Sequence, residues 1–169
     1  MTLDELNRLS EPEAREALRA CCGASPWVTG MLGARPFASR DEMLAAADQA
    51  WAALPRADVA EAIAHHPRLG ASGAAAPLST RASGWSAGEQ SGIATSADAV
   101  RAALAAGNDE YERRFGHTFI LCATGLDASQ MLEALRLRLT HDDGTEHDVT
   151  ARELHRITRL RLEKLLSGD

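Results

Sequence analysis

Apolar side chains recur at every third or fourth position along much of the chain, which is the spacing of an amphipathic helix. One stripe consists of Met43, Leu44, Ala47, Ala50, Trp51 and Leu54, and Pro55 follows it. A second stripe consists of Met131, Leu132, Leu135 and Leu139. Alanine is abundant between Ala45 and Ala106, which favours helix and allows close helix packing. The pattern predicts an all-α fold, a bundle of about eight helices in one domain over residues 1–169.

Helix starts are marked by the spacing Ser/Thr-x-x-Glu, in which the two side chains cap the first turn reciprocally. The spacing occurs at Thr2–Glu5, Ser10–Glu13, Ser39–Glu42, Ser86–Glu89 and Thr150–Glu153. We therefore expect the last helix to begin near Thr150, after a polar turn at residues 141–147. A second loop is expected between His65 and Ser83, where prolines, glycines and other small residues are frequent.

One short apolar run, Thr118 to Ala123, is bounded by Gly116 and Gly125. It fits a buried extended segment or the start of a buried helix, and periodicity does not distinguish the two. We expect one short extended segment here. If it borders a cavity, the backbone of Phe119, Ile120, Leu121, Cys122 and Ala123 offers donors and acceptors to an amide-rich ligand. The alternative is that the run only fills the core.

Composition excludes several classes of protein. The net charge of −6 disfavours binding to a nucleic acid backbone. No apolar run approaches the roughly 18 residues of a membrane-spanning helix, and the acidic N-terminus is unlike a signal peptide. Three cysteines, with Cys21 and Cys22 adjacent and Cys122 alone, make a poor disulfide framework. We therefore expect reduced thiols in a cytoplasmic protein, with the adjacent pair at a helix end.

His66 is the first candidate for chemistry. Pro67 disfavours helical geometry at the preceding residue, so His66 is expected to leave the helix that ends near Ala64. An imidazole held at a helix end beside a loop of small residues is well placed to transfer protons near neutral pH. The alternative is a histidine that only packs against the helix end.

Two further sites carry polar side chains in positions that suit a ligand. Ser86, Glu89 and Gln90 lie at a predicted helix N-terminus, where free N–H groups could bind a small polar heterocycle, although a capping box alone explains the spacing. Arg161 shares one helix face with Leu154, Ile157 and Leu165, so its guanidinium needs a buried acceptor. That acceptor is an internal carboxylate or an anionic ligand. The histidines and aspartates of residues 141–147 match no metal-binding spacing, and we expect no metal site.

Several segments, taken in order, resemble one family. They are Arg35-Pro36-Phe37; His66-Pro67 followed by Leu69-Gly70; Ser86-x-x-Glu89-Gln90; Asn108-x-x-Tyr111-x-x-Arg114-Phe115-Gly116-x-x-Phe119 to Ala123; and Glu153 through Ile157 to Leu160-Arg161-Leu162. Together they resemble 2-oxo-4-hydroxy-4-carboxy-5-ureidoimidazoline (OHCU) decarboxylase, an enzyme of urate degradation. The similarity runs from about residue 25 to residue 165.

The resemblance implies an all-α enzyme that needs no cofactor or metal and that converts a small-molecule substrate to (S)-allantoin. It implies that His66 is the catalytic acid/base, that Glu89 assists, and that Pro67, Ser86, Gln90 and Arg161 surround the substrate. The main chain of Phe119 to Ala123 would hold the ring and ureido amides. The family is commonly dimeric, so a homodimer is expected.

The chain departs from the family pattern in places. Arg68 replaces an acidic residue after His66-Pro67, His117-Thr118 replaces an aromatic residue and proline, and the loop from Ala71 to Ser83 is rich in alanine. These changes could alter how the cavity closes. Two other functions stay open: a helical binding module without catalysis, and a hydrolase of a ureido or cyclic amide in which His66 activates water.

Overall fold

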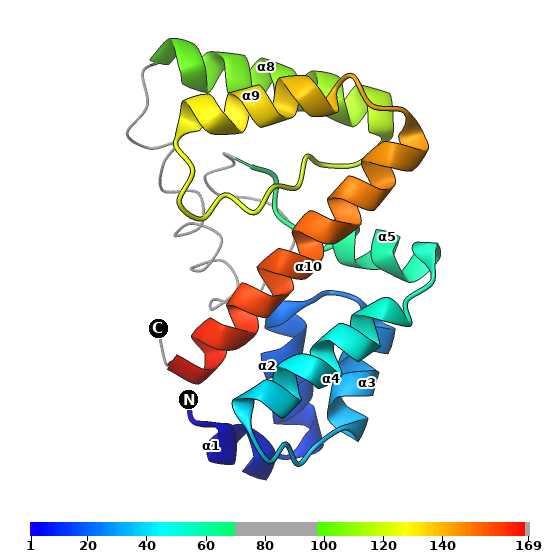
Figure 1. Ribbon diagram of the computed structural model, residues 1–169, viewed down its shortest axis with the longest axis vertical. Coiled ribbons are helices and arrows are strands. Elements are labelled where there is room, and N and C mark those ends of the chain that lie inside the picture. Colours follow the sequence, from blue (N-terminus) through cyan, green and yellow to red (C-terminus); the bar gives the residue numbers. More distant parts are fainter. Residues whose placement is uncertain (70–97, 168–169) are drawn as a thin grey trace. The chain divides into compact units, whose positions relative to one another are not determined.

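A computed structural model describes residues 1–69 and 98–167. Within these residues the chain forms helices and no strand, so the all-α prediction is confirmed. The helices are α1 (Leu3–Arg8), α2 (Glu11–Cys21), α3 (Ser25–Gly33), α4 (Arg40–Ala52), α5 (Arg56–Ala64), α8 (Asp98–Phe115), α9 (Ala128–Arg138) and α10 (Asp143–Ser167) (Figure 1). The chain divides into two compact units, Met1–Ala62 with His155–Asp169, and Ile63–Leu154.

The first unit contains α1 to α4, most of α5 and the C-terminal part of α10. The predicted stripe on α4 buries Met43, Leu44 and Ala47. Trp27 of α3 is fully buried, and its indole N–H donates to the carbonyl of Ala47 over 3.1 Å. This bond joins α3 to α4 and satisfies the one polar atom of a large core side chain.

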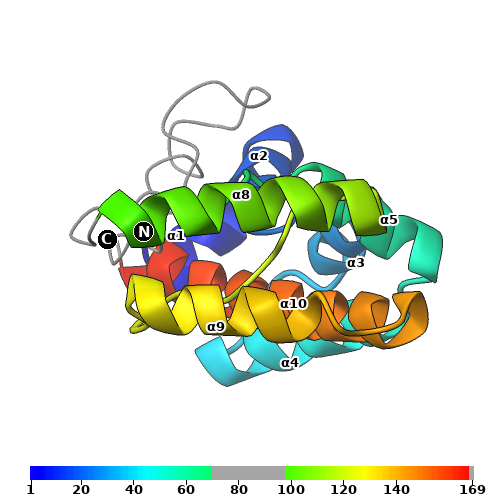
Figure 2. The same cartoon turned by 90° about the horizontal axis from the view of Figure 1, so that it is seen from above.

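The second unit is built on α8 and α9, which lie side by side and run in the same direction (Figures 1 and 2). The same direction is possible because the connection at residues 116–127 returns along the length of the pair (Figure 1). The stripe predicted on α9 is confirmed, since Met131, Leu132 and Leu135 are buried. A Cβ atom at Gly107 would lie 2.6 Å from Cδ2 of Leu135, so the close contact of the two helices favours glycine there.

Most predicted helix starts within the described residues are confirmed. Thr2–Glu5 and Ser10–Glu13 form full capping boxes. Ser39 accepts from the amide of Glu42, but the Glu42 carboxylate accepts from the amide of Ala38 instead of closing the box. A further box, Asp127–Gln130, starts α9. The Ser/Thr-x-x-Glu spacing missed it because aspartate and glutamine play the two roles.

The predicted start of the last helix is wrong. α10 begins at Asp143, so most of the expected turn at residues 141–147 is helical. The carboxylate of Asp142 accepts hydrogen bonds from the amide and hydroxyl of Thr145, at 2.8 and 2.9 Å, and caps the helix there. Thr150 is buried inside α10, and Glu153 bonds to a residue far along the chain, so this pair is no capping box.

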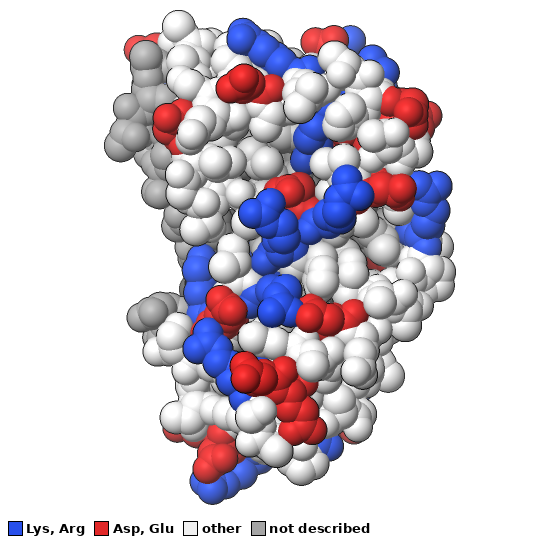
Figure 3. All heavy atoms as spheres, viewed as in Figure 1, with Lys and Arg blue, Asp and Glu red and all other residues white. Residues whose placement is uncertain are grey.

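No helix in residues 1–69 and 98–167 is long and apolar enough to cross a membrane. On the face drawn in Figure 3, basic and acidic side chains are intermingled. This mixture is the usual pattern of a solvated helical surface.

Candidate active site

The turn after α5 carries His66. The N–H of His66 donates to the carbonyl of Ile63 over 3.0 Å, which closes the last turn of the helix. His66 lies in a bend and Pro67 follows outside the helix, as predicted. Both residues are partly buried, so the imidazole is neither sealed in the core nor fully solvated.

Arg68 connects this turn to α8. Its guanidinium hydrogen-bonds to the Asp109 carboxylate, and Nε lies 3.0 Å from Oε1 of Glu112. Asp109 and Glu112 stand one helical turn apart, so they face the same arginine. The family motif has an acidic residue at this position. In this chain the position is occupied by Arg68, whose guanidinium contacts two acidic side chains of α8.

The segment at residues 118–123 is neither helix nor strand, so the alternative of a buried helix start is wrong. Phe119, Ile120, Cys122 and Ala123 are buried, and Leu121 is partly buried. Because no sheet or helix ladder pairs its backbone, the buried N–H and C=O groups need other partners.

Side chains and a turn supply three of these partners. The carbonyl of Ile120 accepts from the Arg138 guanidinium, and the amide of Cys122 donates to Oε2 of Glu153 over 2.8 Å. The carbonyl of Ala123 accepts from the amide of Leu126. The backbone of Phe119 and of Leu121 makes no hydrogen bond to any residue within the described ranges.

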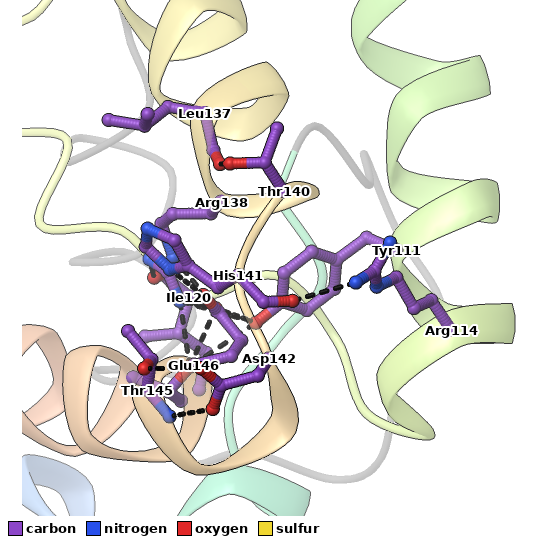
Figure 4. Close-up of polar contacts among 11 residues, drawn as sticks. Tyr111, Arg114, Ile120, Leu137, Arg138, Thr140, His141, Asp142, Thr145 and Glu146 are labelled. Carbon is purple, nitrogen blue, oxygen red and sulfur yellow. Dashed lines mark hydrogen bonds and ion pairs between the residues drawn. The ribbon is translucent and has the colours of Figure 1, made fainter.

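A buried polar cluster contacts this segment at Ile120 (Figure 4). Arg138 Nε is 2.8 Å from Oε1 of Glu146, and Nη2 is 2.7 Å from the hydroxyl oxygen of Thr150. Tyr111 donates its phenolic O–H to the same carboxylate. Nδ1 of His141 lies 2.8 Å from Oε2, the other oxygen of the Glu146 carboxylate. Helices α8, α9 and α10 and the loop segment thus meet at one ion pair.

The pair in this cluster is charged. Burial by itself raises the pKa of Glu146, but the hydrogen bonds from Arg138 and Tyr111 and the arginine charge lower it further, so the net pKa lies below its usual value. Burial and the bond to Glu146 raise the pKa of Tyr111, which keeps its proton. The guanidinium of Arg138 also lies over the Phe119 ring, 4.6 Å from its centroid.

Sequence reasoning missed this cluster, although a signal was present. Arg138 follows Leu135 by three residues and directly precedes Leu139, so it falls within the apolar stripe of α9. The same argument does predict Arg161 correctly. Arg161 is 4% exposed and lies on α10 between the buried Ile157 and Leu165, within the first unit.

Cys22 lies close to Arg161 in the first unit. Burial raises the pKa of its thiol to about 11, against the opposing effects of a hydrogen bond with the Ala24 backbone and of the Arg161 charge. Such a thiol stays protonated and is a poor nucleophile. Cys21 is the last residue of α2, so the prediction that this pair sits at a helix end is confirmed.

Part of the predicted site lies outside the described residues, namely Ser86, Glu89 and Gln90. His66, Pro67 and the segment Phe119 to Ala123 belong to the second unit. In the described ranges no group of three or more His, Cys, Asp or Glu side chains could hold a metal ion.

The fold is shared with solved structures. A crystal structure of an OHCU decarboxylase in the presence of (S)-allantoin matches with a TM-score of 0.75 and 28% identity, over 90% of this chain and 98% of that one. A structure of (S)-allantoin synthase matches with a TM-score of 0.71 over 98% of this chain and 54% of that one. At 18% identity, the second comparison concerns the fold alone.

The sequence defines the family. The profile of OHCU decarboxylase matches residues 7–163, and the chain belongs to that family. An OHCU decarboxylase of Haloferax volcanii is 26% identical over 100% of this chain and 98% of its own length. Uric acid degradation bifunctional protein TTL of Arabidopsis thaliana is 30% identical over 88% of this chain. The bifunctional protein PucL of Bacillus subtilis is 26% identical over 98% of this chain. The chain spans 46% of TTL and 33% of PucL.

Proposed function

We propose that this protein decarboxylates OHCU to (S)-allantoin in urate degradation, without a cofactor. The proposal depends chiefly on the similarity to an OHCU decarboxylase over nearly the full length of both chains. The family match runs through both compact units, which supports one functional domain over the whole chain. Buried thiols at Cys21, Cys22 and Cys122 support a cytoplasmic protein, and a homodimer is proposed from the family resemblance.

In this proposal His66 is the catalytic acid/base, and Glu89 orients it or accepts a hydrogen bond from the substrate. His66 lies in a bend at the end of α5, is partly buried and is followed by Pro67, and this position supports the catalytic role. Pro67, Ser86 and Gln90 complete the surroundings of the substrate.

The substrate anion is assigned to Arg161. This assignment follows the family resemblance, and it is supported by the position of a buried guanidinium, 4% exposed, within the apolar stripe of α10. The planar fork of arginine matches a carboxylate, and holding that carboxylate out of the ring plane would favour loss of CO₂.

The ring and ureido amides are assigned to the main chain of Phe119 to Ala123. The carbonyl of Ile120 and the amide of Cys122 already have partners in the protein. The substrate would therefore bind chiefly to the other main-chain groups, above all the N–H and C=O of Leu121. Leu121 offers one donor and one acceptor from a partly buried residue, which is what an amide edge requires.

The reaction then needs no more than positioning, charge stabilisation and proton transfer. The bond from the ring carbon to the carboxylate breaks, CO₂ leaves, and the electron pair stays in the ring, where adjacent unsaturated groups delocalise it. Overall, the anionic substrate takes up one proton. Delivery of that proton to one face of the ring by His66 would fix the (S) configuration, and proton transfer of this kind contributes about 10²–10⁴-fold in rate.

A coupled assay tests the function. OHCU is generated in situ from urate, and the optical activity of allantoin is followed with and without the purified protein. We expect the protein to accelerate the appearance of (S)-allantoin. Acceleration of only the preceding ring opening would favour the hydrolase, and no acceleration of either step would favour the binding module.

A further inference from the structure

Glu153 lies outside every role assigned above, yet it contacts the proposed substrate-binding segment. It belongs to α10 within the second unit, and its carboxylate accepts a hydrogen bond of 2.8 Å from the amide of Cys122. Glu153 is partly buried, so solvent competes with the bond only in part.

The bond has a counterpart two residues earlier. The carbonyl of Ile120 is held by Arg138, which is itself fixed by Glu146, Thr150 and Tyr111. Each of the two peptide groups of Leu121 is therefore held at its other end: one through the carbonyl of Ile120, and one through the amide of Cys122. Both anchors come from helices, Arg138 from the end of α9 and Glu153 from the middle of α10.

A segment without a helical or sheet ladder has its conformation set by such side-chain contacts. Residues that line a binding site must be held to within about 0.5 Å to work well, and contacts from rigid elements provide this precision. The contact from Glu153 determines the orientation of the peptide group that joins Leu121 to Cys122. The carbonyl of that peptide group belongs to Leu121, which is the acceptor assigned to the substrate.

We propose that Glu153 is a positioning residue for substrate binding, which fixes the Leu121–Cys122 peptide group through the amide of Cys122. The inference depends on the proposed function. Glu153 acts through its acceptor oxygen. A glutamine side chain has the same length and an uncharged acceptor oxygen, so it should preserve the function, whereas the shorter side chain of aspartate should not.

The test compares three variants of the full chain in the coupled assay. Glu153→Ala removes the acceptor, and Glu153→Asp withdraws it by one C–C bond, about 1.5 Å. For both we expect KM to rise and kcat/KM to fall by about tenfold to a hundredfold, as is typical of a misplaced binding group. Glu153→Gln keeps an acceptor at the same distance and should stay within about threefold of the wild type. Glu133→Ala, at an exposed position on α9, is the control.

Two readouts separate positioning from stability. A residue that only stabilises the fold would lower Tm and the amount of active enzyme without changing KM in the folded fraction. Hydrogen exchange at the Cys122 amide should be faster in Glu153→Ala and Glu153→Asp than in Glu153→Gln and the wild type. This measurement tests the contact itself without any substrate, and Glu153→Asp serves where Glu153→Ala does not fold.

The outcomes are distinct. Unchanged KM in folded Glu153→Ala and Glu153→Asp would overturn the role of Glu153 while the proposed function stands. A loss in Glu153→Gln as large as in Glu153→Ala would also overturn it, because the charge and not the acceptor would then matter. Absence of turnover in the wild type would instead reject the proposed function, and with it a role for Glu153 toward this substrate.

Discussion

Two arginines in apolar stripes have different surroundings in this protein. Arg138 has its acceptors within the second unit: a carboxylate, two hydroxyl groups and a main-chain carbonyl. Arg161 lies in the first unit near the buried thiol of Cys22, where burial raises the thiol pKa and the arginine charge opposes that rise. The sequence treats both alike, as a charged residue at an apolar helical position. Their roles differ because the neighbouring helices bring different groups to them.

The assignment of His66 predicts a specific loss of activity. His66→Asn keeps a polar side chain of similar size but transfers no proton near neutral pH, so kcat should fall by about a hundredfold or more. His65→Asn is a matched control, since His65 is the exposed neighbour in the same turn. Circular dichroism should show equal helix content in both variants. Near-wild-type turnover in folded His66→Asn would refute the assignment.

Arg161 is tested by a change that keeps its charge. Arg161→Lys replaces the planar fork with a single ammonium, so a bidentate carboxylate contact is lost. We expect kcat/KM for OHCU to fall by about tenfold or more, since each 1.4 kcal/mol of lost transition-state binding is a factor of ten. Thermal unfolding of the same sample distinguishes the alternative. A large drop in Tm with normal turnover of the folded fraction would indicate an internal ion pair instead.

At the scale of elements, α10 differs most from what local patterns predict. A capping residue upstream, Asp142, starts α10 well before Thr150. The early start brings Glu146 and Thr150 into the helix, where their side chains reach Arg138. The buried cluster therefore depends on where this helix begins.

The capping box of α9 makes a prediction at the same scale. Asp127 accepts from the amide of Gln130 over 2.9 Å, and the Gln130 side chain accepts from the amide of Asp127 over 2.9 Å. Asp127→Ala should lower stability by about 1 kcal/mol. For a chain of this size, that is a decrease in Tm of about 2–4 °C by calorimetry. Asp127→Ser retains a capping oxygen and should lose little, and equal losses in the two variants would contradict the capping role.

At the scale of the whole molecule, the charge of Glu146 should contribute to stability in a defined pH range. The folded pKa of this carboxyl lies below its usual value of 4.5, so the unfolded chain binds more protons between the two values. The stabilisation is complete above about pH 4.5 and is lost as the pH falls through the folded pKa. Acid should therefore weaken the whole fold through this one buried pair, with Asp48, whose pKa is also lowered, adding to the effect.

Glu146→Gln isolates this contribution. At pH 7 the variant leaves Arg138 buried without a charged partner, so we expect a loss of about 3–5 kcal/mol in the free energy of unfolding. Urea titrations at pH 7 and pH 3 give the free energy of unfolding of both proteins. The difference between the wild type and the variant should be smaller at pH 3 than at pH 7. Asp48 is present in both proteins, so its titration cancels from the difference. A gap that stays constant between the two pH values would contradict a charged Glu146.

The sequence by itself determined the features that depend on local spacing. Apolar periodicity predicted α4 and α9, the residue before Pro67 predicted the bend at His66, and the stripe on the last helix predicted a buried Arg161. The family motifs identified the family, since they are contiguous patterns in the chain.

Only the tertiary structure decided which groups of the Phe119 to Ala123 segment are occupied. Arg138 lies 18 residues from Ile120 along the chain, and Glu153 lies 31 residues from Cys122. No local pattern links such pairs, because their contact depends on how α9 and α10 cross the loop. Periodicity reports which side of a helix is buried, whereas the partner of each buried polar group is set by the packing of elements distant in sequence.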